Sequence, residues 1–188
     1  MRLMKYSAIA AALALTGCVD VDLTATVTGA DTARLTGYME VQTEILNMMG
    51  GAELFCNAEE GGTLEMTDTT ARCNMLVEGT FAEVFEGEPG EPVPTAIDLG
   101  NGTVRVAFPL GEMTADSAEM RNDPQAAQMM GPMLAGHSFT IRIAGAEIVS
   151  TNGTIDDGGQ SASYSFPLAE ILNPDFVIPE VFEAVVRY

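Results

Sequence analysis

Positive charge is scarce in this sequence, and from residue 18 onward lysine is missing altogether. The 188-residue chain holds eight Lys and Arg against 27 Asp and Glu, and two of those eight are Arg2 and Lys5. The 171 residues that follow position 17 therefore carry six arginines and all 27 acids, a formal balance of −21. Because nucleic acids are bound through basic contacts to phosphate, we expect no nucleic acid partner. We also expect no electrostatic attachment to anionic headgroups, and the acidity is typical of a solvated surface.

Histidine occurs once, as His137, which restricts the catalytic chemistry that the chain can hold. Any Ser-His-Asp or Cys-His arrangement must use this residue, and no serine lies in a nucleophile-elbow glycine pattern. His137 follows Gly136 where a strand is expected to begin, so a surface or capping role is expected. No glycine-rich phosphate cradle is present, and in so acidic a chain paired carboxylates carry no signal. We therefore expect neither catalysis nor a cofactor.

A metal site is also not expected. Residues 154–158 lack the alternation and the terminal Glu of a calcium loop. Met129, Met130 and Met133 with His137 supply soft ligands of the kind that bind Cu(I), but methionines at helical spacing are typical of a core.

Long apolar runs are absent after residue 18, so no stretch there reaches the length of a transmembrane helix. The N-terminus differs, since a basic start is followed by a short apolar segment at 7–15, the pattern of a secretory signal. The next residues, Leu15-Thr16-Gly17-Cys18, resemble the lipobox of bacterial lipoproteins. The resemblance implies that residues 1–17 are a signal peptide and that Cys18 becomes a lipidated N-terminus. Each buried methylene of its acyl chains contributes about 0.8 kcal/mol, so attachment would be permanent.

The lipobox resemblance also implies a location. The protein is expected to be anchored to a cell membrane by its N-terminal acyl chains, on the periplasmic or extracytoplasmic side. Val19, rather than Asp, follows the lipidated cysteine, which favours an outer membrane where the cell has one.

Cys56 and Cys73 remain as an even pair in an exported protein, so we expect a disulfide. Closing this loop stabilises a fold by about 3 kcal/mol in the chain-entropy model. The residues between them are polar and rich in turn formers, with little core. The alternative is a metal site, for which two cysteines without a neighbouring histidine supply half of the ligands.

The first third of the expected domain shows a period of two. Residues 19–28 alternate apolar and polar side chains, which predicts a strand, and residues 33–42 predict its hairpin partner. Tyr38, Val41, Ile45 and Met48 also fit one helical face. We therefore expect a strand to about Gln42 followed by a short helix that Gly50 and Gly51 terminate.

The middle of the chain contains two local signals. Residues 73–79 predict a strand, after which Thr80 is placed to cap a short helix that carries Phe81, Val84 and Phe85 on one side. A proline-rich, acidic loop at 86–95 follows. Asn101-Gly102 then lies between two alternating runs, a strong signal for a hairpin with a primed turn.

Residues 112–135 switch to helical composition, with Asp123 placed as a cap and Pro124 in the first turn. We expect two helical pieces broken near 122–123, the second interrupted again at Gly131-Pro132. Strands are expected at 137–145, 146–153 and 161–168. The last run, 177–188, fits an edge strand or a terminal helix, and we favour the strand with Pro179 near its start.

The order of these elements in residues 18–188 resembles the LppM-type lipoprotein domain. The resemblance is clearest in FTIRIAGAEIVSTNG at 139–153 followed by SASYSFPL at 161–168, and it extends to Leu35-Thr36-Gly37 and to FAEVF at 81–85. It implies a single α+β domain in which a curved, mostly antiparallel sheet and one or two packed helices enclose an apolar space. It further implies a protein that binds or moves lipids or glycolipids.

Methionine is unbranched and polarizable, so it repacks easily around varied apolar partners. We hypothesise that a methionine-rich helix lies across the open face of the sheet and holds one lipid tail against two strands. The helix contributes Met129, Met130, Met133 and Leu134, and the strands contribute Phe139, Ile141, Ile143, Tyr164 and Phe166. One alternative is an ordinary closed core. The other is a structural or assembly lipoprotein that docks an envelope protein complex through its acidic surface.

Overall fold

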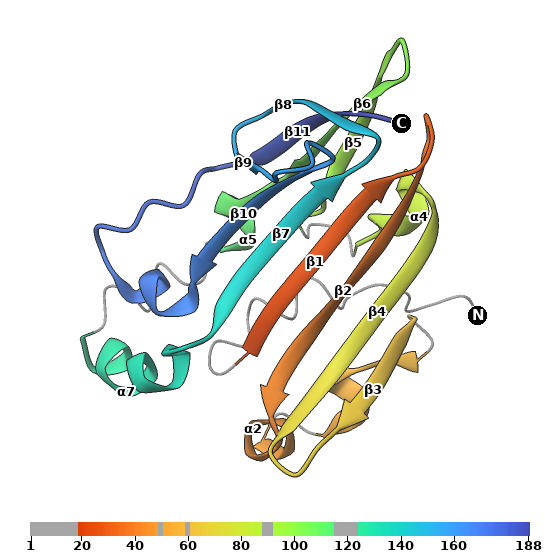
Figure 1. Cartoon of the computed structure of the whole chain (residues 1–188). Helices are drawn as coiled ribbons and strands as arrows, with labels where there is room; N and C mark the ends of the chain where they lie inside the picture. The colour runs from red at the N-terminus through yellow and green to blue at the C-terminus, as the bar shows by residue number, and fades with distance from the viewer. Residues whose placement is uncertain (1–18, 49–50, 59–60, 88–91, 115–123) are drawn as a thin grey trace.

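The computed structural model of the chain describes residues 19–48, 51–58, 61–87, 92–114 and 124–188 (Figure 1). These residues form an α+β domain whose strands divide between two sheets, both mostly antiparallel, with short helices at their ends (Figure 1). The predicted fold class is therefore confirmed. The expected signal peptide at 1–17 and the lipidated Cys18 lie outside the described residues.

The larger sheet has seven strands, and the first strand of the chain lies in its centre. In spatial order the strands are β3 (Gly62–Met66), β4 (Thr70–Thr80), β2 (Thr32–Gln42), β1 (Val19–Val27), β7 (Ser138–Ala144), β10 (Ser161–Pro167) and β9 (Thr154–Ile155). The predicted β1–β2 hairpin is confirmed, with a register from Val19 opposite Val41 to Val27 opposite Ala33. On its other side β1 pairs in parallel with β7, and Leu23 lies opposite Ile141.

The second sheet has four strands and lies behind one end of the first (Figure 1). Its spatial order is β5 (Thr95–Gly100), β6 (Thr103–Phe108), β11 (Phe182–Arg187) and β8 (Glu147–Thr151). Asn101 and Gly102 join β5 to β6 with φ angles of 55° and 75°, as the primed turn predicted from the sequence requires. The strand predicted at the C-terminus is confirmed as β11, but it is not an edge strand, because it pairs with both β6 and β8.

The described helices are short, and several follow from local sequence signals. The described ones are α2 (Thr43–Met48), α3 (Ala52–Phe55), α4 (Phe81–Val84), α5 (Leu110–Met113), α7 (Pro124–Leu134) and the 3-10 helix η2 (Leu168–Leu172). The predicted change from strand to helix after Gln42 is confirmed. Thr80 caps α4 in a capping box, because its side chain accepts from the Glu83 N–H while the Glu83 carboxylate accepts from the Thr80 N–H.

One helical prediction is wrong. Helix α7 continues through Gly131 and Pro132, where an interruption was expected. Proline removes one helical N–H and crowds the preceding turn, so the helix continues past Pro132 at a cost. The last turn also brings Leu134 into the core with 2% of its surface exposed, which stabilises the continued helix. The predicted break at 122–123 and the Asp123 cap lie outside the described residues.

Alternation places the apolar side chains of the larger sheet on one side, which we call the inner face. On β1 its members are Val21, Leu23, Ala25 and Val27, all buried. Aromatic contacts join this face to the second sheet, since the Phe182 ring of β11 lies 6.1 Å from Tyr164 on β10 and 6.5 Å from Phe108 on β6. The core therefore lies between the two sheets.

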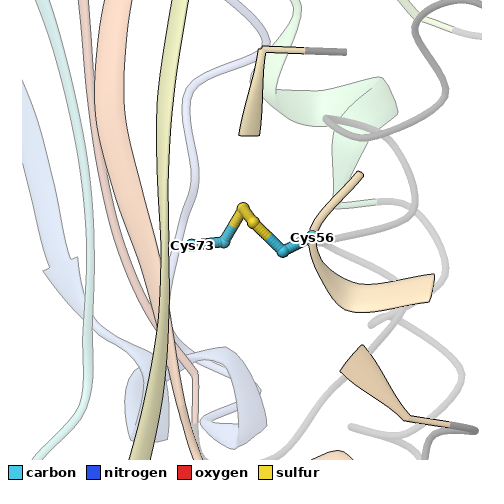
Figure 2. The surroundings of a disulfide bond; sticks show 2 residues. All are labelled: Cys56 and Cys73. Carbon is cyan, nitrogen blue, oxygen red and sulfur yellow. A yellow bond between two sulfur atoms is a disulfide. The ribbon is translucent and has the colours of Figure 1, made fainter. Parts of the chain in front are cut away.

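The predicted disulfide joins Cys56, after α3, to Cys73 on β4, with a Cα–Cα distance of 5.4 Å (Figure 2). It fastens the α3 segment to the inner face, on which Cys73 is buried. The described part of the segment between the cysteines has more regular structure than its turn-rich sequence indicates. It contains β3, which pairs with β4 so that Leu64 lies opposite Cys73.

Four elements gather at the end of the larger sheet where β1 begins, which we call the proximal end: the start of β1, α2, α7 and η2 (Figure 1). The topology requires this arrangement. Helix α2 follows β2, which runs antiparallel to β1, and η2 follows β10, which runs antiparallel to β7. Helix α7 precedes β7, which runs parallel to β1, so it also lies at this end.

Candidate functional site

The strand residues proposed to bind a lipid do lie together. Phe139, Ile141 and Ile143 come from β7, while Tyr164 and Phe166 come from the neighbouring strand β10. Their register pairs Phe139 with Phe166 and Ile141 with Tyr164, so all five share the inner face. The rings of Phe139 and Phe166 are 5.2 Å apart, and Phe176 adds a third ring 5.5 Å from Phe166. The sequence did not indicate Phe176, which lies in the irregular segment after η2.

These side chains are closely packed. Ile141 and Ile143 have no exposed surface, and Phe139 and Phe166 are also buried, so only Tyr164 keeps part of its surface exposed. Burial raises the pKa of the Tyr164 phenol above its ordinary value, and the group stays neutral. The predicted wall is therefore aromatic, neutral and closed.

The methionine-rich helix lies elsewhere than expected. Helix α7 stands at the proximal end beside η2 and does not cross the sheet face (Figure 1). Leu134 is buried and Met130 packs partly against the core, whereas Met133 is half-buried and Met129 is 74% exposed. The reason is topological, because only residues 135–137 separate α7 from β7. A connection this short keeps the helix beside the start of that strand.

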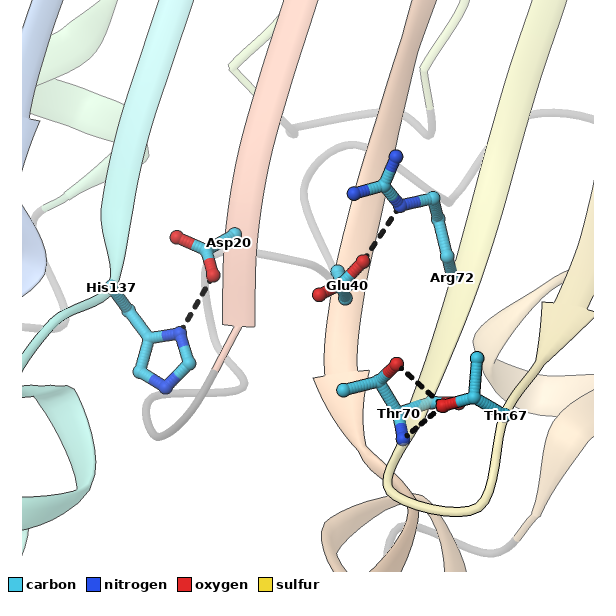
Figure 3. A network of polar contacts seen from close by, with 6 residues as sticks. All are labelled: Asp20, Glu40, Thr67, Thr70, Arg72 and His137. Carbon is cyan, nitrogen blue, oxygen red and sulfur yellow. Dashed lines mark hydrogen bonds and ion pairs between the residues drawn. The ribbon is translucent and has the colours of Figure 1, made fainter.

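A polar contact that the sequence did not indicate links β1 to the junction between α7 and β7. The carboxylate of Asp20 accepts a hydrogen bond of 2.8 Å from the backbone N–H of Ser138, and its other oxygen lies 2.8 Å from Nδ1 of His137 (Figure 3). Asp20 is the second residue of β1, whereas His137 joins α7 to β7. The side chain of His137 is 20% exposed, and the surface or capping role expected of it stays a prediction. No local pattern could have revealed a contact between residues 117 positions apart.

The opposite side of the larger sheet, which we call the outer face, carries ion pairs. Arg72 donates a hydrogen bond of 2.7 Å to Glu40 (Figure 3). The Arg72 guanidinium also lies 4.0 Å from the centre of the Tyr38 ring. The hydrogen bond to Glu40 raises the pKa of Arg72, so the charge is retained. Arg142 on β7 pairs with Asp22 on β1. These charges bridge neighbouring strands and neutralise one another.

Among the residues that the structure describes, no three His, Cys, Asp or Glu side chains come together as a metal-binding group requires. Within the same ranges, no helix has the length and apolarity needed to cross a bilayer. The features that remain as a candidate site are therefore the aromatic inner face near the proximal end and the helix α7 beside it.

Comparison of the chain with protein-family models and with curated proteins gives no match. Comparison with solved structures gives a match to the NMR structure of the folded domain of LppM from Mycobacterium tuberculosis. The alignment covers 92% of this chain and 92% of the LppM chain, with a TM-score of 0.43 and 10% sequence identity. A likeness of this degree says nothing about ligand or activity.

Proposed function

We propose that this protein is a non-enzymatic lipoprotein of the cell envelope, held to a membrane by acyl chains on Cys18. The observation that carries the proposal is the position of the first strand. Strand β1 begins at Val19, directly after the cysteine that the Leu15-Thr16-Gly17-Cys18 motif marks for modification. Processing at Cys18 would therefore remove no residue of β1.

The test is the mass of the protein made from the full chain in a bacterium that processes lipoproteins. We expect loss of residues 1–17 and a gain equal to a diacylglyceryl group plus an amide-linked acyl chain. A Cys18→Ser control should keep the N-terminal segment and carry no lipid. An unmodified thiol at position 18, or retention of residues 1–17 in the unaltered chain, would overturn the proposal.

We further propose that the domain binds one acyl chain of an envelope lipid between α7 and the adjoining ends of β7 and β10. The aromatic wall and the neighbouring helix support this binding site. The side chains of Phe139 and Phe166 form an aromatic wall on the inner face next to the proximal end. Helix α7 adjoins that end and offers Met130 and Met133, which adapt to apolar partners of varied shape.

Because the wall is closely packed without a ligand, binding requires α7 to move. The helix adjoins η2, and its Leu134 side chain is buried in the core. An acyl chain entering here replaces the contacts of Leu134 and Met130 with its own methylenes. Such an exchange of one apolar partner for another changes the buried area little, so a small element can open without unfolding the two sheets.

The binding test uses a fluorescent fatty acid, cis-parinaric acid, titrated in detergent-free buffer into residues 19–188 made without the acyl chains, into which the probe would otherwise partition. We expect saturable binding of one molecule per chain at micromolar probe concentration. Met130→Glu should weaken binding by about tenfold or more, because a carboxylate next to an acyl chain is costly to desolvate. The matched control is Met66→Glu on β3, where the methionine is 54% exposed, and it should bind as the unaltered chain does.

A failure to bind the fatty acid would favour the second candidate, a structural or assembly lipoprotein that docks an envelope protein complex through its acidic surface. The closed packing of Phe139, Ile141 and Ile143 favours this second candidate, because a filled core needs no ligand. The two candidates share the Cys18 anchor and differ in what the domain recognises.

A further inference from the structure

We propose that α7 is a membrane-contact element, and that the domain rests on the bilayer with the uncharged side of this helix in the headgroup region. The inference rests on the proposed anchor at Cys18 and adds to it the orientation of the domain. The occupant of this surface is a bilayer of low net charge. Three features of the proximal end support the assignment.

The first feature is proximity to the anchor. Asp20 is two residues after Cys18, and two residues span about 7 Å at most. The Asp20 carboxylate accepts a hydrogen bond from the Ser138 N–H and contacts the His137 ring. The backbone N–H of His137 donates to the carbonyl oxygen of Leu134, the last residue of α7. A short chain of contacts thus joins the anchoring position to the end of α7. Acyl chains on Cys18 would bring this helix to the membrane surface.

The second feature is the chemistry of the helix. Residues 124–146 contain no Asp or Glu, although the chain has 27 of them, and α7 itself carries no charged residue. Met129 is 74% exposed, the second highest value among the large apolar side chains of the described residues. Helices that lie at a bilayer surface bury their apolar side chains among the headgroups and upper acyl chains. Because α7 has no Lys or Arg, its contact is apolar and short-ranged.

The third feature is the charge around the helix. Glu44 of α2 and Asp68 of the β3–β4 turn are exposed acids that lie apart from α7, whereas the exposed Asp175 follows η2, which adjoins α7. Carboxylates are repelled by anionic headgroups and stay hydrated, so α2 and the β3–β4 turn are held away from the surface. The domain therefore tilts onto α7, the helix of the proximal end that has no charged residue. The contact should be strong on zwitterionic lipid and weaker on anionic lipid.

The experiment measures the depth of a label on the lipidated protein. The full chain with Met129→Cys is made in a lipoprotein-processing host, labelled with bimane and placed in phosphatidylcholine vesicles that contain brominated lipid. The label reaches position 129 alone, because Cys56 and Cys73 form a disulfide and Cys18 carries lipid through its sulfur. Ile97→Cys on β5 is the matched control, because Ile97 is 54% exposed on the second sheet, which lies away from α7 (Figure 1).

We expect brominated lipid to quench the label at 129 at least about threefold more than the label at 97, as burial among headgroups requires. A label on Gln128→Cys, at an exposed neighbouring position of α7, should be quenched as strongly as the label at 129. Replacing a third of the phosphatidylcholine with phosphatidylglycerol should reduce the quenching at 129. Equal quenching at 97 and 129 on protein with the lipidated mass would overturn the orientation alone. Protein of unlipidated mass would overturn the anchor, and the orientation with it.

Discussion

The two faces of the seven-stranded sheet are made by alternate residues of the same strands, yet they hold different interactions. The inner face packs aliphatic and aromatic side chains such as Ile141 and Phe139 against the rest of the core. The outer face holds partly exposed ion pairs such as Arg142 with Asp22, whose side chains are 33% and 30% exposed. Apolar burial contributes several kcal/mol per large side chain, whereas exposed ion pairs contribute at most about 1 kcal/mol. The comparison teaches that the inner face supplies most of the stability of the fold and that the outer face adds weak links between neighbouring strands.

The largest effect is expected from the inner face. Phe139→Ala removes a buried ring that packs on Phe166 and should lower the free energy of unfolding by about 3–5 kcal/mol. Urea denaturation followed by circular dichroism measures the change. Thr36→Ala, on the outer side of β2, is the matched control and should stay within about 0.5 kcal/mol of the unaltered chain. Similar losses from both variants would contradict the division between the faces.

The disulfide is the next largest contribution. Replacing Cys56 and Cys73 together by Ser should lower the stability by about 2–4 kcal/mol, because the unfolded chain regains the freedom that the closed loop removes. Reduction of the unaltered chain should have the same effect as the double replacement. If the reduced protein unfolded no more easily than the oxidised one, the covalent link would be unimportant to the inner face.

The capping box of α4 is expected to contribute an intermediate amount to stability, because it satisfies backbone N–H groups without an ion pair. Thr80→Ala removes the acceptor for the Glu83 N–H and should cost about 1 kcal/mol in thermal or urea unfolding. This loss should exceed that of any single ion pair on the outer face. A change below the error of the measurement would mean that the cap is replaced by water.

The same box predicts a small dependence on pH. The hydrogen bonds from the Thr80 backbone and side chain lower the pKa of Glu83 in the folded state. Its stabilising contribution is therefore fully present above the pKa of the unfolded chain and is lost as the pH falls through the lowered folded pKa. Glu83→Gln should be less stable than the unaltered chain at neutral pH, and the difference should shrink in acid. A difference that is constant across this range would contradict the assignment.

The smallest effect is expected from an outer-face ion pair. Asp22→Asn removes the partner of Arg142 and should change the stability by about 0.2–1 kcal/mol, with the effect reduced at high salt. A double-mutant cycle with Arg142→Gln isolates the pairwise energy. A coupling above about 2 kcal/mol would show that the pair is more shielded from water than its exposure indicates.

Much of the fold could be predicted because its signals are local. Alternation predicted β1, β2, β7 and β10, and the same period of two placed Phe139, Ile141 and Ile143 on one face. Asn101-Gly102 predicted a turn and Thr80 predicted a cap, because each acts within a few residues. The pairing of Cys56 with Cys73 needed only an even count in a chain that was expected to be exported.

The remaining features depend on contacts between distant segments. Nothing near Val19 shows that β1 will pair in parallel with β7, and this pairing places α7 at the proximal end. Alternation shows that β11 has one buried face, but not that it lies between β6 and β8, because edge and interior strands share the same period. The number of sheets and the position of the methionine-rich helix follow from these distant pairings.

The central place of β1 determines how the molecule responds to a pull from its N-terminus. A force along β1 loads the hydrogen bonds to β2 and β7 together, in shear, instead of peeling them apart one at a time. An edge strand would be stripped away with far less work. The same placement delays completion of the sheet, since β1 emerges first during synthesis and its neighbour β7 emerges more than a hundred residues later. A force applied at the N-terminus is therefore transmitted to both neighbours of β1 only after β7, in the last third of the chain, has paired with it.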